Sequence, residues 1–430
     1  MSTPKANGVE AQQQWPRADL SRVPYDVYHS QEVINLERER IFEGATWSYL
    51  ALEAELPEPG TFIVSSVGDI PVVVTRDEEG EIHAVVNRCK HRGAAVCRER
   101  RGKTDGLTCV YHQWRYDLKG KLTGVPFRRG IKGQGGMPKD FKLDEHNLDA
   151  LKVSCYRGLI FGTFSDETPP LEEFLGKEMI ALLDRVFHKP VKVLGYNKQV
   201  VPANWKLYAE NTKDPYHASL LHLFHATFGL YRSTLKGGVT LDESGMHSAI
   251  FAKKGTDDES TLGSAFSSTR FQGLEAEDTR FKLEDPSILS GPVEFDDGIS
   301  TLIMYLFPSL VVQQIGNTLA TRKVIPHAPD KFELYWTYFG YADDDAELEQ
   351  CRVKQANLIG PAGLISMEDG EATRLVQMTL QGTEGQHSVL EMGGRGPIET
   401  VDHLVSETSI RGMWENYCRF MGYEVSHDEK

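Results

Sequence analysis

The sequence predicts an α+β fold in which a small antiparallel β domain is inserted into a larger domain of antiparallel strands and helices. Short β-rich runs such as IPVVVTRD and IHAVVNR follow one another between residues 46 and 165, separated by Gly, Asp and Glu turns. A charged helical stretch precedes these runs, and a mixture of helices and strands follows them. We therefore expect a β domain over 46–165 and a second domain built from 1–45 and 166–430.

The remaining elements follow in order along the chain. SQEVINLERERIFEGA has the pattern of a helix before the β domain, and DPYHASLLHLFHATFGL has that of a helix after it. Three runs then indicate consecutive antiparallel strands, namely TLIMYLFPSLVVQQIG, TLATRKVIPH and FELYWTYFGYA. The run DDDAELEQCRVKQANLIG indicates a helix that ends at Gly360-Pro361.

Composition narrows the class of protein. A length of 430 residues suits two or three lobes, and a net charge of −15 argues against nucleic acid or an anionic membrane as the partner. The first twenty residues have no apolar core of a secretory signal, and no apolar run approaches the ~18–20 residues that span a bilayer. We expect a cytoplasmic protein, in which clustered cysteines mean metal or redox chemistry.

Two Cys/His pairs form the first candidate metal site. Cys89 and His91 stand in NRCKHRG, and Cys109 and His112 stand in CVYHQW, with seventeen residues between the two pairs. Each arm mixes one thiolate with one imidazole across a β framework, which is typical of a Rieske 2Fe–2S centre. A structural zinc site would also use two Cys and two His, although its arms usually space them differently. The other four cysteines lack such partners and are interpreted as buried thiols.

The second candidate site lies in NWKLYAENTKDPYHASLLH. His217 and His222 are five residues apart and can reach one metal if the helix between them is distorted. With one carboxylate they would form the triad that suits non-haem iron(II) and leaves positions open for dioxygen. Asp369 in GLISMEDGEATRL is the best candidate, and Glu368 and Glu371 are its rivals. Each histidine also has a plain structural reading as a satisfied core residue.

These residues resemble the large subunits of aromatic-ring-hydroxylating dioxygenases, from about Val23 to Met421. The resemblance is carried by CVYHQW, GVPFRRG, GQGGMPKDF, DPYHASLLHLFHATF, GPAGLISMED and SETSIRG. Within that family the chain is most similar to the three-component anthranilate 1,2-dioxygenases, with terephthalate dioxygenases and salicylate 5-hydroxylases nearly as similar. The resemblance implies a helix-grip-like catalytic domain around the second site, with His217, His222 and Asp369 as the iron ligands.

The resemblance also implies partners and a reaction. Asp214 matches the acid that links a Rieske histidine of one subunit to an iron histidine of the next, although before Pro215 it also has the pattern of a helix N-cap. An α3β3 assembly with a small subunit is implied. Electrons from NADH would arrive through a reductase and a Rieske-type or plant-type ferredoxin, and anthranilate and O2 would give catechol, CO2 and ammonia. The alternative from another class is a Rieske protein that only carries electrons.

Arg322 is the candidate for binding the substrate carboxylate. In the strand-like TLATRKVIP it shares a face with Ala320 and Val324, so its guanidinium is expected to be partly buried and to need a partner. A substrate carboxylate could be that partner and accept two hydrogen bonds from the guanidinium. The alternative partner is an acid elsewhere in the chain. Members of the resembling subgroup act on carboxylated rings and look to carry an arginine here. Terephthalate enzymes look to have a further arginine where this chain has Leu404, which favours a monocarboxylate. Asn211 is assigned to the substrate site with Arg322.

Overall fold

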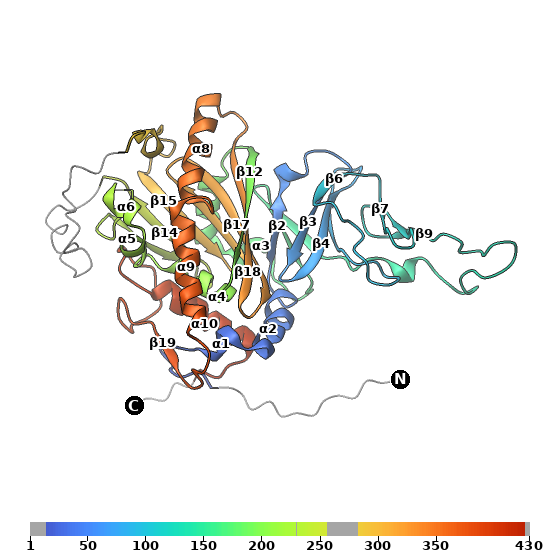
Figure 1. Cartoon of the computed structure of the whole chain (residues 1–430), viewed down its shortest axis with the longest axis horizontal. Coiled ribbons are helices and arrows are strands. Elements are labelled where there is room, and N and C mark those ends of the chain that lie inside the picture. The colour runs from blue at the N-terminus through green and yellow to red at the C-terminus, as the bar shows by residue number, and fades with distance from the viewer. Residues whose placement is uncertain (1–13, 229, 256–282, 426–430) are drawn as a thin grey trace.

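A computed structural model describes residues 14–228, 230–255 and 283–425 of the chain, so residues 1–13, 229, 256–282 and 426–430 of the expected larger domain lie outside the described residues. Antiparallel sheets and helices together give the α+β fold expected from the sequence. Figure 1 shows a large sheet crossed by long helices on one side of the molecule and a set of short strands on the other. The two candidate metal sites lie in these two different parts.

The large sheet has seven antiparallel strands in the order β12-β18-β17-β16-β15-β14-β13. Its strands are β12 (Val191–Val201), β13 (Gly237–Leu241), β14 (Ser248–Lys253), β15 (Ile299–Leu306), β16 (Leu310–Ile315), β17 (Thr318–Ala328) and β18 (Lys331–Tyr341). The last four are the consecutive strands predicted from the sequence, although TLIMYLFPSLVVQQIG splits into β15 and β16. Because β16 is buried at every residue, both faces of the sheet are covered there.

Three small antiparallel sheets lie in the other part, in the orders β5-β4-β3-β6, β7-β8-β9 and β10-β11-β2. Their strands are β2 (Ser48–Leu52), β3 (Thr61–Val67), β4 (Ile70–Arg76), β5 (Ile82–Val86), β6 (Arg101–Lys103), β7 (Leu107–Thr108), β8 (Arg115–Tyr116), β9 (Leu122–Gly124), β10 (Lys152–Tyr156) and β11 (Leu159–Thr163). Phe62, Val73 and Trp114 belong to a core of this part that is separate from the main one. We propose 46–165 as the domain that these strands form.

Helices cover the large sheet and connect its strands. They are α1 (Asp26–His29), α2 (Gln31–Glu37), α3 (Leu171–Val186), α4 (Trp205–Lys213), α5 (Ala218–Leu221), α6 (Leu223–Thr227), α8 (Ala346–Ile359), α9 (Leu364–Met378) and α10 (Thr408–Met421). A short antiparallel pair, β1 (Arg22–Pro24) with β19 (His387–Val389), links the N-terminal segment to the segment between α9 and α10. As predicted, Gly360 stops α8, as the residue that caps its C-terminal end. Among the described residues, no helix is both long and apolar enough to cross a bilayer.

The elements that hold the second site are set by local sequence. The side chain of Asn204 caps α4 by accepting the backbone N–H of Lys206. The helix predicted over DPYHASLLHLFHATFGL is broken into the short α5 and α6, because His222 between them has ψ 80°. Gly363 begins α9 so close to α8 that an added Cβ would lie 2.0 Å from the Leu358 carbonyl oxygen. This tight turn brings α9 back against α4.

Candidate metal centres

Two similar tight loops carry the Cys/His pairs of the small β part. The backbone N–H of Cys89 donates to the Ala94 carbonyl, and that of Cys109 donates to the Trp114 carbonyl. Each loop therefore closes on itself and presents its cysteine and histidine on the same side. Both thiols are buried, and the rings of His91 and His112 lie 4.5 Å apart between centroids. The Trp114 ring stacks on His91 at 4.8 Å and holds that ring in place.

The donor atoms of these four residues fit a bound iron–sulfur cluster. The Nδ1 atoms of His91 and His112 are buried and have no hydrogen-bond partner. Buried polar nitrogens are rarely left without a partner, so both point to a missing ligand. The Cys89 sulfur lies 3.3 Å from the Tyr116 hydroxyl. Burial raises the pKa of Cys109, and the neighbouring Cys89 contributes to that rise. Iron would hold both sulfurs as thiolates.

The same geometry weighs against a single zinc ion. Tetrahedral zinc draws its four ligand atoms around one point at ~2.0–2.3 Å. Cys89, His91, Cys109 and His112 do not form a group whose ligand atoms all lie within 4.8 Å of one another, whereas His217, His222 and Asp369 do. A cysteine pair and a histidine pair held apart suit a cluster with two irons, in which each iron takes one pair.

The second site brings together the three residues predicted from the sequence. Nε2 of His222 lies 3.2 Å from Asp369 Oδ1, and Nε2 of His217 lies 3.5 Å from the same oxygen. His222 and Asp369 are buried and His217 is partly buried. Two imidazole nitrogens and one carboxylate oxygen on one side of a metal position form the facial arrangement that suits non-haem iron(II). The rival Glu371 is instead paired with Arg374 on the surface.

The pKa shifts of the residues at this site also fit a bound cation. Burial by itself lowers the pKa of His217, but Asp214 and Asp369 outweigh burial and raise that pKa to about 10. Burial acts to raise the pKa of Asp369, yet contacts with His217 and His222 hold it well below its usual range. The buried carboxylate thus demands a positive charge beside it. A divalent metal would supply that charge in place of the proton.

Two acids contact the outer nitrogens of the histidines. Oδ2 of Asp214 lies 3.3 Å from Nδ1 of His217, and Oε2 of Glu368 lies 2.8 Å from Nδ1 of His222. Such contacts fix which imidazole nitrogen faces a metal. Asp214 is not the predicted helix N-cap, because α5 begins only at Ala218. It lies at the C-terminal end of α4, where Oδ1 accepts the backbone N–H groups of Tyr216 and His217.

A cavity opens beside the triad, and Arg322 is on its wall. Arg322 is 4 % exposed. One of its terminal nitrogens donates to the Tyr208 hydroxyl at 3.0 Å, and the other donates to the Gln313 side-chain oxygen. The guanidinium also lies 4.4 Å from the centroid of the Trp336 ring. Its Nε is buried without a partner, and no carboxylate in the described part of the chain pairs with it.

Sequence reasoning missed or misjudged other residues around this site. Asn211 lines the cavity as expected of a substrate residue, but its Nδ2 also donates to Asp369 Oδ1 at 3.1 Å. His225 lines the cavity with a buried Nε2 that has no partner, and its ring lies 5.6 Å from that of His222. Glu368 appeared only as a rival ligand. No sequence signal separated these roles, since each depends on contacts between segments far apart in the chain.

The fold and these two sites define an oxidoreductase with one cluster site and one separate mononuclear iron site. Comparison with known proteins identifies the family. Residues 46–135 match the Rieske [2Fe-2S] domain, and residues 185–422 match the catalytic domain of the ring-hydroxylating alpha subunits. The chain therefore belongs to the family of ring-hydroxylating dioxygenase alpha subunits, whose cofactors are a Rieske 2Fe–2S cluster and a mononuclear iron.

Several relatives are similar along almost their whole length. The anthranilate 1,2-dioxygenase large subunit of Burkholderia cepacia is 51% identical over 410 residues, which is 95% of both chains. An alpha subunit of the terephthalate 1,2-dioxygenase terminal oxygenase of Comamonas sp. is 46% identical, covering 96% of this chain and 98% of its own. In fold, naphthalene 1,2-dioxygenase from Rhodococcus sp. bound to indole matches with a TM-score of 0.76 at 26% identity, over 95% of both chains.

Proposed function

We propose that the chain is the large subunit of a terminal oxygenase that dihydroxylates a carboxylated aromatic ring, with anthranilate as the substrate. The reaction would take anthranilate, O2, NADH and two protons to catechol, CO2, ammonia and NAD+. Salicylate 5-hydroxylation and terephthalate dihydroxylation are the alternatives, because an alpha subunit for terephthalate and the salicylate 5-hydroxylase large component of Ralstonia sp. are 46% and 41% identical to the chain. Electron transfer without catalysis is disfavoured by the triad and by the catalytic-domain match.

The observation that carries the proposal is the buried guanidinium of Arg322 beside the iron site. It has polar neighbours but no acid among the described residues, so it retains a positive charge that a substrate carboxylate can neutralise. Arg322 lines a cavity whose wall also carries the apolar residues Ile250, Ile303 and Ile365, and its buried Nε has no partner. A cavity with apolar residues on part of its wall and one arginine suits a benzene ring that bears one carboxylate.

The surroundings of Leu404 favour a monocarboxylate. Leu404 is fully buried in an apolar cluster with Tyr231 and Ile250, and both of these line the iron cavity. This position therefore offers no second cation beside the cavity. A second carboxylate, as in terephthalate, would enter this apolar region without a partner, which costs about 1–3 kcal/mol or more for an unpaired polar group.

The side chains of the two sites would then have separate roles. His217, His222 and Asp369 would hold the iron, and Cys89, His91, Cys109 and His112 would hold the cluster. The cluster supplies electrons and the iron supplies oxygen activation when both are bound. Arg322 would orient the ring by its carboxylate, and the isoleucines of the cavity would keep water from it. The unpartnered Nε2 of His225 can interact with the amino group beside the carboxylate.

Product analysis tests the substrate directly. The purified oxygenase, reconstituted with a ferredoxin and a reductase, is supplied with anthranilate, salicylate, benzoate and terephthalate in turn. We expect anthranilate to give catechol and ammonia in equal amounts. We also expect it to have the highest kcat/KM of the four substrates. A higher kcat/KM for salicylate or terephthalate would replace anthranilate by that substrate and leave the class of enzyme unchanged.

Replacing Arg322 with leucine should raise KM for the carboxylated substrate and spare both metal centres. The expected loss of transition-state binding is about 2–5 kcal/mol, as for one partner removed from a buried charge pair. Steady-state kinetics measure the loss, and iron content with the visible spectrum checks the centres. An Arg322→Lys variant keeps the positive charge but lacks the planar guanidinium. Its KM should lie between those of the wild type and Arg322→Leu. Unchanged kinetics in Arg322→Leu would refute the role.

The arrangement of the two sites supports assembly into a ring. In Figure 1 the strands β7 and β9, whose region carries Cys109 and His112, lie at the opposite end of the molecule from α5 and α6, which flank His222. Val110 and Tyr111, between the cluster ligands, are more than half exposed. We propose that this edge docks against the iron site of a neighbouring copy in an α3β3 assembly with a small subunit.

Replacing Asp214 with asparagine tests this bridge. Asparagine caps a turn as well as aspartate does, so the turn at Tyr216 and His217 should survive. The negative charge beside His217 would be lost, and turnover should fall about 10- to 100-fold, the cost typical of outer partners of metal-bound histidines. Both centres should remain by iron content and visible spectrum, and rapid-mixing kinetics should locate the defect in the oxidation of the reduced cluster. Near-normal activity would mean that Asp214 only shapes the turn.

A further inference from the structure

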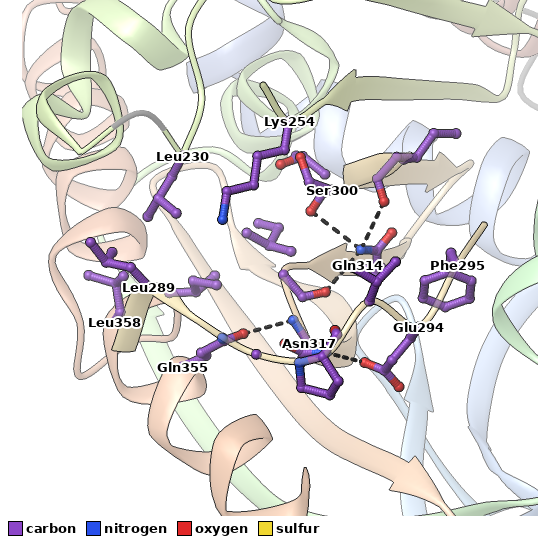
Figure 2. Close-up of a pocket in the computed structure, with 18 of the residues that line it drawn as sticks. Leu230, Lys254, Leu289, Glu294, Phe295, Ser300, Gln314, Asn317, Gln355 and Leu358 are labelled. Atoms are coloured by element: carbon purple, nitrogen blue, oxygen red, sulfur yellow. Dashed lines mark hydrogen bonds between the residues drawn. The ribbon is translucent and has the colours of Figure 1, made fainter. Parts of the chain in front are cut away.

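Figure 2 shows a larger cavity, of about 360 Å³. It shares lining residues with the iron cavity and so lies next to it. An enclosed apolar space of roughly 150 Å³ is enough for a benzene ring, so this one has room for a substituted ring. Its walls are mostly apolar and come from segments far apart in the chain. They include Leu230, Leu289, Val293, Ile299, Leu358 and Ile359. None of these residues belongs to the triad or to the wall around it.

The two cavities share part of their walls. Thr301 and Ile315 line both of them, and these residues face each other across β15 and β16. Alternate residues of a strand point to the same face, so Thr301 and Ile303 share one face of β15, and Ile299 precedes them beyond a register shift against β14. Ile299 lines the larger cavity and Ile303 lines the iron cavity. This face therefore runs from one cavity to the other.

The larger cavity has one acid and one lysine on its wall. The acid, Glu294, is fully engaged, because both of its oxygens pair with Arg352 and one also accepts from Asn317. Lys254 points into the cavity, as Figure 2 shows, and has no ion pair with any described residue. The cavity thus presents a mostly apolar surface and one lysine that pairs with no acid in the described part of the chain. An aromatic ring with a single carboxylate matches both features.

We propose that this cavity is an antechamber that binds the aromatic carboxylate before it reaches the iron. The Lys254 ammonium pairs with the carboxylate, and the leucine and isoleucine walls take the ring. The substrate then passes Thr301 and Ile315 into the iron cavity, where Arg322 takes over the carboxylate. The inference rests on the proposed function for the class of substrate. It adds a second binding site and a residue, Lys254, that would set the rate of capture.

Fluorine NMR on the intact, iron-loaded oxygenase under anaerobic conditions tests the antechamber with 5-fluoroanthranilate as the probe. Two bound signals are expected, one strongly shifted and broadened by the nearby iron and one sharper. Lys254→Gln should weaken the sharper site about fivefold, in line with one solvent-accessible ion pair, and should reduce its salt dependence. Leu289→Trp should remove it by filling the space. Lys177→Gln removes a lysine that is 85% exposed and lies outside both cavities, so it should change neither signal.

Further measurements separate this inference from the proposed function. Arg322→Leu should remove the broadened signal and keep the sharper one, and the uncharged 5-fluoroanthranilamide should lose most of its affinity for the antechamber. Stopped-flow association with the wild-type protein should slow at high salt, and Lys254→Gln should lose that dependence. A single broadened signal in the wild type would overturn the antechamber and leave the proposed function standing. A probe that binds at neither place would overturn the substrate class as well.

Discussion

Replacing Asp369 with alanine should remove the mononuclear iron and abolish hydroxylation, while the Rieske spectrum stays intact. Asp369 is the single carboxylate that faces both His217 and His222 through one oxygen. Without it the site has two neutral donors and no negative charge, and iron(II) binding needs the carboxylate of the triad. Iron analysis should fall from three irons per chain, two in the cluster and one in the triad, to two. The reduced cluster should no longer be oxidised by O2 in the presence of substrate.

Glu368 and Glu371, which lie close to Asp369 in the chain, provide matched controls for Asp369→Ala. Glu368→Ala removes the acid from Nδ1 of His222 but leaves the ligand set, so we expect weaker iron binding by about 10- to 100-fold rather than complete loss. Glu371→Ala only breaks a surface pair with Arg374 and should behave as the wild type. If Asp369→Ala kept its iron and turned over while Glu368→Ala did not, the ligand assignment would be wrong by one position.

The candidate metal ligands could be predicted from the sequence because the spacing of their Cys and His residues is typical of metal sites. Cys89 with His91 and Cys109 with His112 are local pairs, and each is held by a loop that closes within six residues. His217 and His222 are also close in the chain, and the break between α5 and α6 that they require is the kind of distortion the spacing demands. Asp369 could be chosen from the sequence only together with its rivals, because three acids stand within four residues of one another.

Contacts between segments far apart in the chain could not be predicted from the sequence. The burial of Arg322 followed from its apolar strand neighbours, but its partners Tyr208 and Gln313 come from α4 and β16. The hydrogen bond of Glu368 to His222 depends on how α9 packs against the broken helix. The pattern of residues along a strand or helix predicts on which side a side chain lies. It does not predict which residue of another element will contact that side chain.

Replacing Cys109 with serine should bleach the protein and end turnover. Thiolate-to-iron charge transfer gives a Rieske protein its red-brown colour, and a serine hydroxyl does not replace the thiolate in a cluster. Cys109 is 2 % exposed and belongs to the apolar core of the small β part together with Cys89 and Trp114. Because cluster binding and folding are linked, thermal unfolding of this part should begin at a lower temperature. The visible spectrum, sulfide content and calorimetry measure the three effects.

Cys97→Ser is the matched control, because Cys97 packs against the same core but has no place among the four ligands. It should keep the colour, the sulfide and the activity, with at most a small loss of stability from the buried hydroxyl. In Cys109→Ser the mononuclear iron should remain, since His217, His222 and Asp369 are in the other part of the molecule and need no contact with the cluster loops. That variant should still bind the substrate. A single turnover started by chemical reduction should also be absent, because dihydroxylation needs two electrons and the iron alone can supply only one. A colourless wild-type protein that contains zinc and no sulfide would contradict the cluster altogether.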